Sequence, residues 1–134
     1  MQYWLFKSEP FKWSWAQQVK KGVEHWDGVR NYQASNNMKA MKIGDRAFFY
    51  HSNKGLEIVG IVEVVKEYYP DHTDPKGRFG MVDFKAIEPV NNPVTLKEIK
   101  ETPSLSEMAL LKQSRLSVSP VRDNEWDIIL KMSK

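Results

Sequence analysis

Three short segments of the chain carry side chains whose chemistry could recognise a ligand. They are Lys7-Ser8-Glu9-Pro10, the stretch from Trp26 to Gln33, and Tyr50-His51-Ser52-Asn53. A lysine supplies N–H donors, whereas hydroxyl and amide groups supply both donors and acceptors. An aromatic ring can stack on the face of a nucleobase, and an amide can match the donor and acceptor on its edge. These residue types fit the recognition of a base or a phosphate.

The second segment holds the densest set of such groups. Trp26 could serve as a stacking platform, and the amides of Asn31 and Gln33 could read the edge of a base. Arg30 could hold a phosphate, and Tyr32 adds a second aromatic ring. The same stretch also has a structural interpretation, in which both aromatic residues belong to the core.

The first and third segments leave the same choice open. Lys7 and Ser8 could face a ligand at the end of a strand, or they could be the solvated end of that strand. Tyr50 and the three polar residues after it, His51, Ser52 and Asn53, could line the mouth of a pocket. A hairpin loop explains them equally well.

Several kinds of chemistry are absent from the sequence. There is no cysteine, which excludes disulfides, thiolate catalysis and cysteine-bound metal centres. No glycine-rich phosphate loop or nucleophile elbow occurs. The three histidines, His25, His51 and His72, have no metal-ligand spacing, so only a site assembled in space from histidine and carboxylate groups remains open. We therefore expect no catalytic residues, no cofactor and no metal.

The composition indicates one globular domain over residues 1–134. A chain of this length is too short for two good cores, and 41% apolar residues are enough for one. The formal charge of +3 favours an anionic partner. The chain has no secretory signal and no apolar run long enough for a bilayer, so we expect a cytoplasmic monomer with no membrane contact.

The hydrophobic pattern predicts an α+β fold, because the elements do not alternate regularly. Expected strands and helices are segregated, and Leu56 to Tyr69, rich in β-branched residues, is predicted to be covered on both faces. The expected strands are 2–7, 46–52, 56–69, 81–87 and a closing segment 116–121. The expected helices are one capped by Ser14, one over 34–41, one capped by Thr95, one near 106–112 and one capped by Asp123.

The three segments, taken together, resemble the successive motifs of the EVE family. The likeness rests on Trp4 to Pro10, Trp26 to Ala34, and Phe49 to Asn53, and continues through Ile58 to Val64, Tyr69 to Asp71, Asp74 to Lys76, Leu116 to Val121 and Glu125-Trp126. It covers essentially the whole chain in order. The resemblance implies a PUA-like, strongly twisted β-barrel with flanking short helices, related to YTH domains and to the thymocyte nuclear protein of animals.

The resemblance also implies a function without catalysis, namely reading a modified base in DNA or RNA. Trp26 would form one wall of an aromatic cage, with Lys7, Ser8, Asn31, Tyr50 and Ser52 around the same pocket. Stacking of a base on an aromatic ring contributes roughly 1 to 3 kcal/mol, whereas one methyl group adds up to about 0.8 kcal/mol. Hydrogen bonds must therefore supply part of the specificity.

The chain departs from the family pattern at two places. The loop after Asp74-Pro75 is shorter than expected, and Phe79-Gly80-Met81 stands where a tryptophan is expected. If the tryptophan of the family encloses the ligand, the cage of this chain is either more open or completed by Phe79. Ser35 stands where arginine is expected, which removes one potential phosphate contact.

Two other functions remain open on the sequence. The related ASCH domains include hydrolases that use a lysine and a carboxylate, and Lys7 and Glu9 could share a face at i and i+2 if the strand continues through Ser8. Alternatively, the exposed aromatic residues could bind a partner protein.

Overall fold

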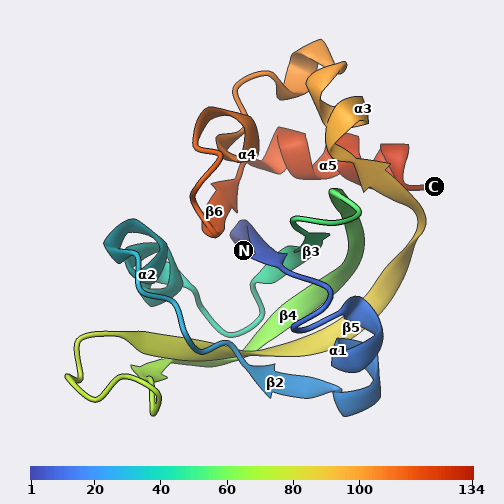
Figure 1. The fold of residues 1–134 in the computed structure, drawn as a ribbon. Coiled ribbons are helices and arrows are strands. Elements are labelled where there is room, and N and C mark those ends of the chain that lie inside the picture. Colours follow the sequence, from blue (N-terminus) through green and yellow to red (C-terminus); the bar gives the residue numbers. More distant parts are fainter.

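The computed structural model describes residues 1–134 and contains one six-stranded sheet with the order β2-β5-β4-β3-β1-β6 (Figure 1). The strands are β1 (Tyr3–Ser8), β2 (Val23–His25), β3 (Arg46–His51), β4 (Glu57–Pro70), β5 (Gly80–Thr95) and β6 (Val118–Val121). The pair β1 and β3 is parallel, and every other neighbouring pair is antiparallel. The predicted α+β class is confirmed.

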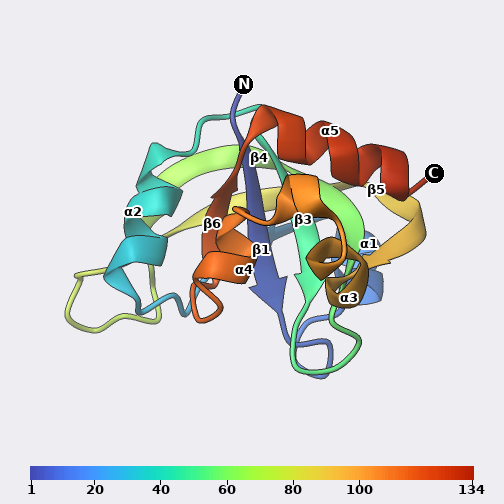
Figure 2. The same ribbon diagram turned by 90° about the horizontal axis from the view of Figure 1, so that it is seen from above.

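Five α-helices and one short 3₁₀ helix flank the sheet. They are α1 (Trp15–Lys21), α2 (Tyr32–Ala40), α3 (Leu96–Lys100), η1 (Pro103–Leu105), α4 (Ala109–Lys112) and α5 (Asp123–Met132). None of these helices has the length and apolar character needed to cross a membrane. The helices α3, α4 and α5 gather on one side of the sheet, as both views show (Figures 1 and 2).

The long ribbon of β4 and β5 gives the sheet its strong curvature. Its ladder shifts register at several points along the ribbon. Such bulges bend the chain and increase its twist. The edge strands β2 and β6 do not pair with each other, so the sheet curves as a PUA-like barrel would but remains unclosed. The segment predicted to close it forms β6, which pairs with β1 at one edge.

Alternation along the central strands divides the core into two clusters. Successive side chains of a strand point to opposite faces. On β1, Phe6 therefore belongs to the cluster shared with α2, whereas Leu5 belongs to the cluster under α3, α4 and α5. On β3, Phe49 joins the first cluster and Phe48 the second. The burial predicted for both faces of β4 holds from Ile58 to Val64, and beyond Val64 the strand has only partly buried or exposed residues.

The structure differs from the expected elements in three places. β5 continues to Thr95, eight residues beyond the expected end at Ile87, because the start of β4 supplies its hydrogen-bonding partners. β2 was not predicted, since three residues are too few for a visible alternation. Ser14 and Thr95 cap α1 and α3 as predicted, whereas Arg122, not Asp123, occupies the N-cap position of α5.

Trp15 fixes the start of α1 against the sheet. Its backbone N–H donates to His51 Nε2 at 3.1 Å, and its ring lies directly over Gly60 of β4. A Cβ atom built on Gly60 would lie only 2.5 Å from the Trp15 ring, so only glycine leaves room for it. The chain that leads from β1 into α1 is thereby held in place at its far end.

We predict that Gly60→Ala lowers the free energy of unfolding by about 1–3 kcal/mol, because the added methyl group overpacks the contact with Trp15. Urea denaturation measures the change. In a Trp15→Ala background the same substitution should cost much less, since the clash is gone. Equal costs in both backgrounds would show that the contact does not constrain Gly60.

Candidate functional site

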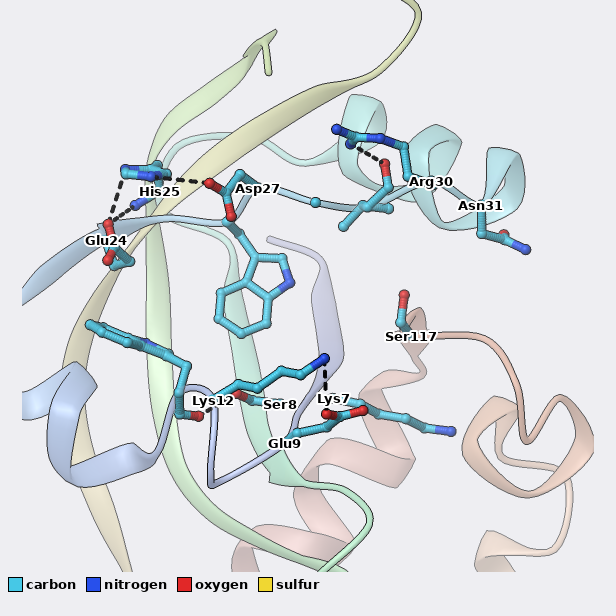
Figure 3. A pocket seen from close by; sticks show the side chains of 14 residues that line it. Lys7, Ser8, Glu9, Lys12, Glu24, His25, Asp27, Arg30, Asn31 and Ser117 are labelled. Atoms are coloured by element: carbon cyan, nitrogen blue, oxygen red, sulfur yellow. Dashed lines mark hydrogen bonds and ion pairs between the residues drawn. The ribbon is translucent and has the colours of Figure 1, made fainter. Parts of the chain in front are cut away.

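A cavity of about 500 Å³ opens between the end of β1 and the segment that joins β2 to α2 (Figure 3). Its lining combines residues from three parts of the chain. They are Lys7, Ser8, Glu9, Lys12, Trp13, Glu24, His25, Trp26, Asp27, Gly28, Val29, Arg30, Asn31 and Ser117. The volume lies within the range of small-molecule sites, roughly 300 to 1,000 Å³.

Backbone and hydroxyl hydrogen bonds hold the end of β1 at the floor of the cavity. The Lys7 N–H donates to the Ser117 carbonyl at 2.9 Å, and the Ser52 N–H donates to the Ser8 carbonyl at 2.9 Å. The Ser8 hydroxyl donates to the Trp13 carbonyl. Ser8 is buried and its proton is committed to the protein, so its main role in this geometry is to shape the floor.

Trp26 is held by the core and still lines the cavity. Its N–H donates to the Val82 carbonyl at 2.7 Å, which fixes the backbone beside β5. Its ring packs at 4.4 Å from the Phe6 ring with a tilt of 58°, and its edge meets Phe49 and Phe84. The ring is only partly buried, so it can offer surface to a ligand in a fixed orientation.

Trp13 is a second tryptophan of the lining that the sequence interpretation missed. Its indole N–H donates to Gln18 Oε1 at 2.9 Å, and the buried Gln18 amide in turn donates to the carbonyls of Gly22 and Phe84. Nothing in the sequence separates Trp13 from the core tryptophans.

The buried carboxylate of Asp71 anchors the segment that carries Trp26. It accepts hydrogen bonds from the Gly28 N–H at 2.8 Å, from Arg30 at 3.0 Å, and from the Thr73 N–H and hydroxyl at 2.7 and 2.6 Å. Burial raises the pKa of Asp71, but the hydrogen bonds from Thr73, Gly28 and Arg30 outweigh it and lower the pKa to about 2. The predicted phosphate ligand Arg30 is thus already paired.

The charges of the lining balance each other. Three basic residues face three acidic ones, and His25 is the only further titratable group. Lys7 Nζ donates to the Ser114 carbonyl at 2.6 Å, and burial lowers the pKa of this lysine. Glu9 pairs with Lys12 at 3.3 Å. A cavity without excess positive charge suits an uncharged base better than a phosphate.

Asn31 contributes free hydrogen-bonding capacity at the rim of the cavity. Its side-chain oxygen accepts from the Ala34 N–H at 2.9 Å and caps α2. Its amide nitrogen has no protein partner and stays available as a donor.

Five of the predicted site residues line this cavity, and seven do not. The five are Lys7, Ser8, Trp26, Arg30 and Asn31. Tyr50 is buried in the cluster under α3, α4 and α5, because alternation along β3 turns it away from the cavity, and burial raises its pKa. His51 accepts the Trp15 N–H, while Ser52 and Asn53 form the turn after β3.

The remaining predicted residues gather outside the cavity. Tyr32 and Phe79 pack against each other with ring centroids 5.0 Å apart, and Gln33 donates to Gln113 at 2.7 Å. The short loop before Phe79 is closed by Asp74, which accepts the backbone N–H groups of residues 76, 78 and 79. Phe79 therefore does not line this cavity.

Ser35, the second departure from the family pattern, is buried and has its own partner. Its hydroxyl lies 2.8 Å from the Tyr68 hydroxyl. The side chain joins α2 to β4 and offers nothing to a ligand.

Comparison with known proteins gives consistent matches over the whole chain. The sequence profile of the EVE domain matches residues 2–132. Mouse thymocyte nuclear protein 1 is 36% identical over 171 residues, covering 98% of this chain and 74% of its own length. Because the alignment is longer than this 134-residue chain, it includes insertions in the mouse protein.

Solved structures give the same result. A protein of Rhodopseudomonas palustris, solved by NMR, is 56% identical with a TM-score of 0.95, covering 99% of this chain and 93% of its own. Human THYN1, crystallised with DNA that contains 5-methylcytosine, is 33% identical with a TM-score of 0.94, covering 100% and 98%. An ASCH protein of Zymomonas mobilis, at 12% identity and a TM-score of 0.63, shares the fold alone.

We predict that Asp71 makes the free energy of unfolding depend on pH in the acidic range. Because its pKa is about 2 in the folded protein and 3.8 in an ordinary aspartate, its contribution is complete above pH 3.8 and is lost as the pH falls toward 2. The free energy of unfolding should drop by about 2 kcal/mol more in the wild type than in Asp71→Asn over this interval.

Urea denaturation at a series of pH values measures this difference. Thr73→Val is the milder variant, because it removes one of the donors and keeps the charge. The acid-induced fall in its free energy of unfolding should lie between those of the wild type and Asp71→Asn. Identical acid profiles for the wild type and Asp71→Asn would contradict the assigned role.

Proposed function

This chain belongs to the EVE domain family, and we propose that it is a non-catalytic module that binds nucleic acid and reads a modified base. The ligand that we propose first is DNA with a methylated cytosine. Human THYN1 was crystallised with DNA that contains 5-methylcytosine, and it is similar to this chain over the whole length of both. The proposal is carried by one observation of this chain, namely a cavity of about 500 Å³ lined by Trp13 and Trp26.

The cavity suits a base that has left the stack of its strand. Extrusion costs a few kcal/mol of lost stacking and pairing. Stacking on an aromatic side chain returns roughly 1 to 3 kcal/mol per base, and Trp26 needs no reorganisation because Phe6 and Val82 already hold it. Contacts to the rest of the strand must supply the remainder.

The polar groups of the lining match the edge of cytosine. Cytosine presents an amino donor beside ring acceptors, and a carboxylate is a suitable acceptor for that amino group. Glu9 offers such a carboxylate through the oxygen that is not paired with Lys12, and the free amide nitrogen of Asn31 offers a donor. The methyl group adds up to about 0.8 kcal/mol when buried, so hydrogen bonds must provide the choice of base.

Phosphate contacts belong outside this cavity. The lining is electrically balanced and Arg30 is paired with Asp71, whereas the whole chain carries a net charge of +3. Lysine and arginine contacts to phosphate make affinity fall with salt without distinguishing one base from another. Phosphate contacts should therefore determine how the affinity depends on salt, whereas the cavity should determine the preference for one base.

The absence of catalysis is supported by the partners of Lys7 and Glu9. The amino group of Lys7 donates to the Ser114 carbonyl, and Glu9 pairs with Lys12, so neither group contacts the other. A hydrolytic site would need the two groups to act on one bond.

We predict that Trp26 carries the discrimination between plain and modified bases. Oligonucleotides that differ only at one cytosine, unmodified, methylated or hydroxymethylated, are compared by fluorescence anisotropy at two salt concentrations, with a methylated-adenine RNA as a second arm. In Trp26→Ala the preference for the modified strand should vanish, with a loss of about 1–3 kcal/mol in binding.

Tyr32→Ala is the matched control, because Tyr32 is an exposed aromatic residue outside the cavity. It should keep the preference. Circular dichroism confirms that Trp26→Ala is folded, and Trp26→Phe serves if it is not. The proposal fails if the wild type binds all strands equally, or if Tyr32→Ala loses the preference and Trp26→Ala keeps it.

We predict no turnover of modified nucleosides. Incubation of acylated and methylated cytidines with the protein, followed by chromatography, should leave the substrates unchanged. Product formation that disappears in Lys7→Ala would replace the binding function with a hydrolase.

A further inference from the structure

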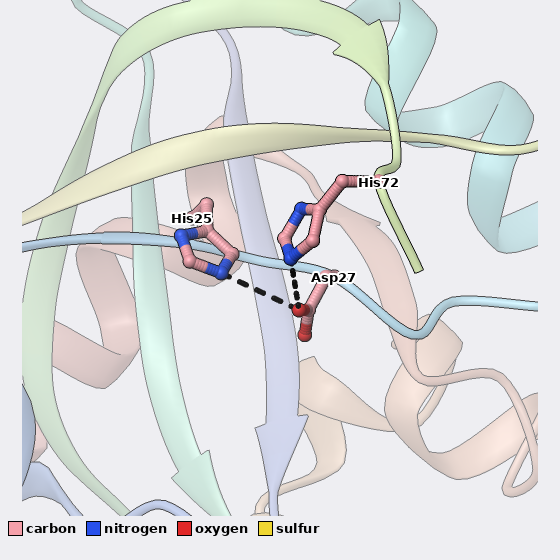
Figure 4. A group of neighbouring side chains, drawn as sticks. All are labelled: His25, Asp27 and His72. Carbon is pink, nitrogen blue, oxygen red and sulfur yellow. Dashed lines mark ion pairs between the residues drawn. The ribbon is translucent and has the colours of Figure 1, made fainter. Parts of the chain in front are cut away.

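We propose that His25, Asp27 and His72 form a binding site for a transition-metal ion, with zinc as the natural candidate. This site goes beyond the reading of a base. The three side chains come from two segments more than forty residues apart in sequence, the end of β2 with the residues just after it and the loop after β4 (Figure 4). One ligand atom from each residue can be chosen so that all lie within 4.8 Å of one another.

The distances approach those of a tetrahedral site. His25 Nε2 lies 3.4 Å from Asp27 Oδ2, and His72 Nε2 lies 3.8 Å from the same oxygen. In a tetrahedral zinc site with bonds of about 2.0–2.1 Å, neighbouring ligand atoms are about 3.3 Å apart. The side chain of His72 is 58% exposed and lies on a loop, so it can move the short distance that brings its Nε2 within reach of the same ion as His25 and Asp27.

A carboxylate behind His25 prepares it as a ligand. Glu24 Oε1 lies 3.0 Å from His25 Nδ1, close enough to pair with a proton on that nitrogen, and Nε2 is the ring atom that faces Asp27. Metal-binding histidines usually donate their other N–H to a carboxylate in this manner, which fixes the ring and makes it a better ligand. This contact is an independent observation that points to a metal.

The negative charges near the site favour a cation, and the types of ligand determine which cation. Glu24, Asp27 and Asp83 all place negative charge near Tyr69, whose pKa is raised by burial and by these carboxylates. Two imidazoles with one carboxylate suit zinc, cobalt and nickel, whereas magnesium and calcium prefer oxygen ligands alone. The neighbouring Asp71 is committed to Gly28, Arg30 and Thr73 and is not a ligand.

The site lies at the rim of the base cavity, because His25 and Asp27 also line it. A bound ion would join the segment that carries Trp26 to the loop after β4 and would keep one position open for water. The ion should therefore raise the thermal stability of the protein, and the increase should grow with the logarithm of its concentration once that exceeds the Kd.

The test uses the untagged full chain after treatment with a chelator. Isothermal titration with zinc chloride at about pH 7.5 should show one site per chain. Cobalt should give the visible absorption of a tetrahedral complex, and magnesium and calcium should give no heat. His72→Ala should weaken zinc binding at least tenfold, by about 1.4 kcal/mol or more.

Three further variants separate a metal site from adventitious binding. Asp27→Asn should also weaken binding, and Glu24→Gln should weaken it about 10- to 100-fold without removing a ligand. His51→Gln is the matched control, because His51 is the histidine outside the cluster, and it should bind as the wild type does. Absence of zinc binding, or equal binding by the wild type and His72→Ala, would overturn the proposal.

Discussion

The cavity depends on one buried carboxylate. Asp71 accepts four hydrogen bonds from Gly28, Arg30 and Thr73, and so ties the irregular chain between β2 and α2 to the loop after β4. A buried charge is stable only when it is paired and hydrogen-bonded, so this carboxylate allows few other conformations of its neighbours. The hydrogen bonds offset the cost of burying the charge, and they orient the segment that carries Trp26 before a ligand arrives.

The remaining restraints act on the other wall. Gly60 admits the Trp15 ring, Trp15 binds His51, and buried Gln18 holds Trp13, so the loop after β1 is fixed by contacts with the sheet. Rigid support of this kind matters for the proposed function, because an extruded base would have to recover in the cavity the stacking energy that it loses. A mobile wall would have to be ordered at the moment of binding, which lowers affinity.

Much of the fold was predictable from the sequence, because alternation and capping are local. The sequence alone shows the β-branched run in β4, the Ser14 cap and the three polar-aromatic segments. The sequence does not show which face of the sheet Tyr50 occupies, because both faces of β3 are buried in the core and both carry apolar residues. Trp13 and the meeting of His25 with His72 were hidden, because they depend on long-range packing and on how β2 and the loop after β4 approach each other.

The central claim is that a modified base occupies the cavity beside Trp26 and Trp13. NMR spectra of the protein labelled with nitrogen-15 report on it directly, since each of the five tryptophans gives one indole N–H signal. On titration with a methylcytosine oligonucleotide, the signals of Trp26 and Trp13 should shift, whereas that of buried Trp4, bound to Asp45, should not. Binding that leaves the Trp26 and Trp13 signals unmoved would contradict the claim.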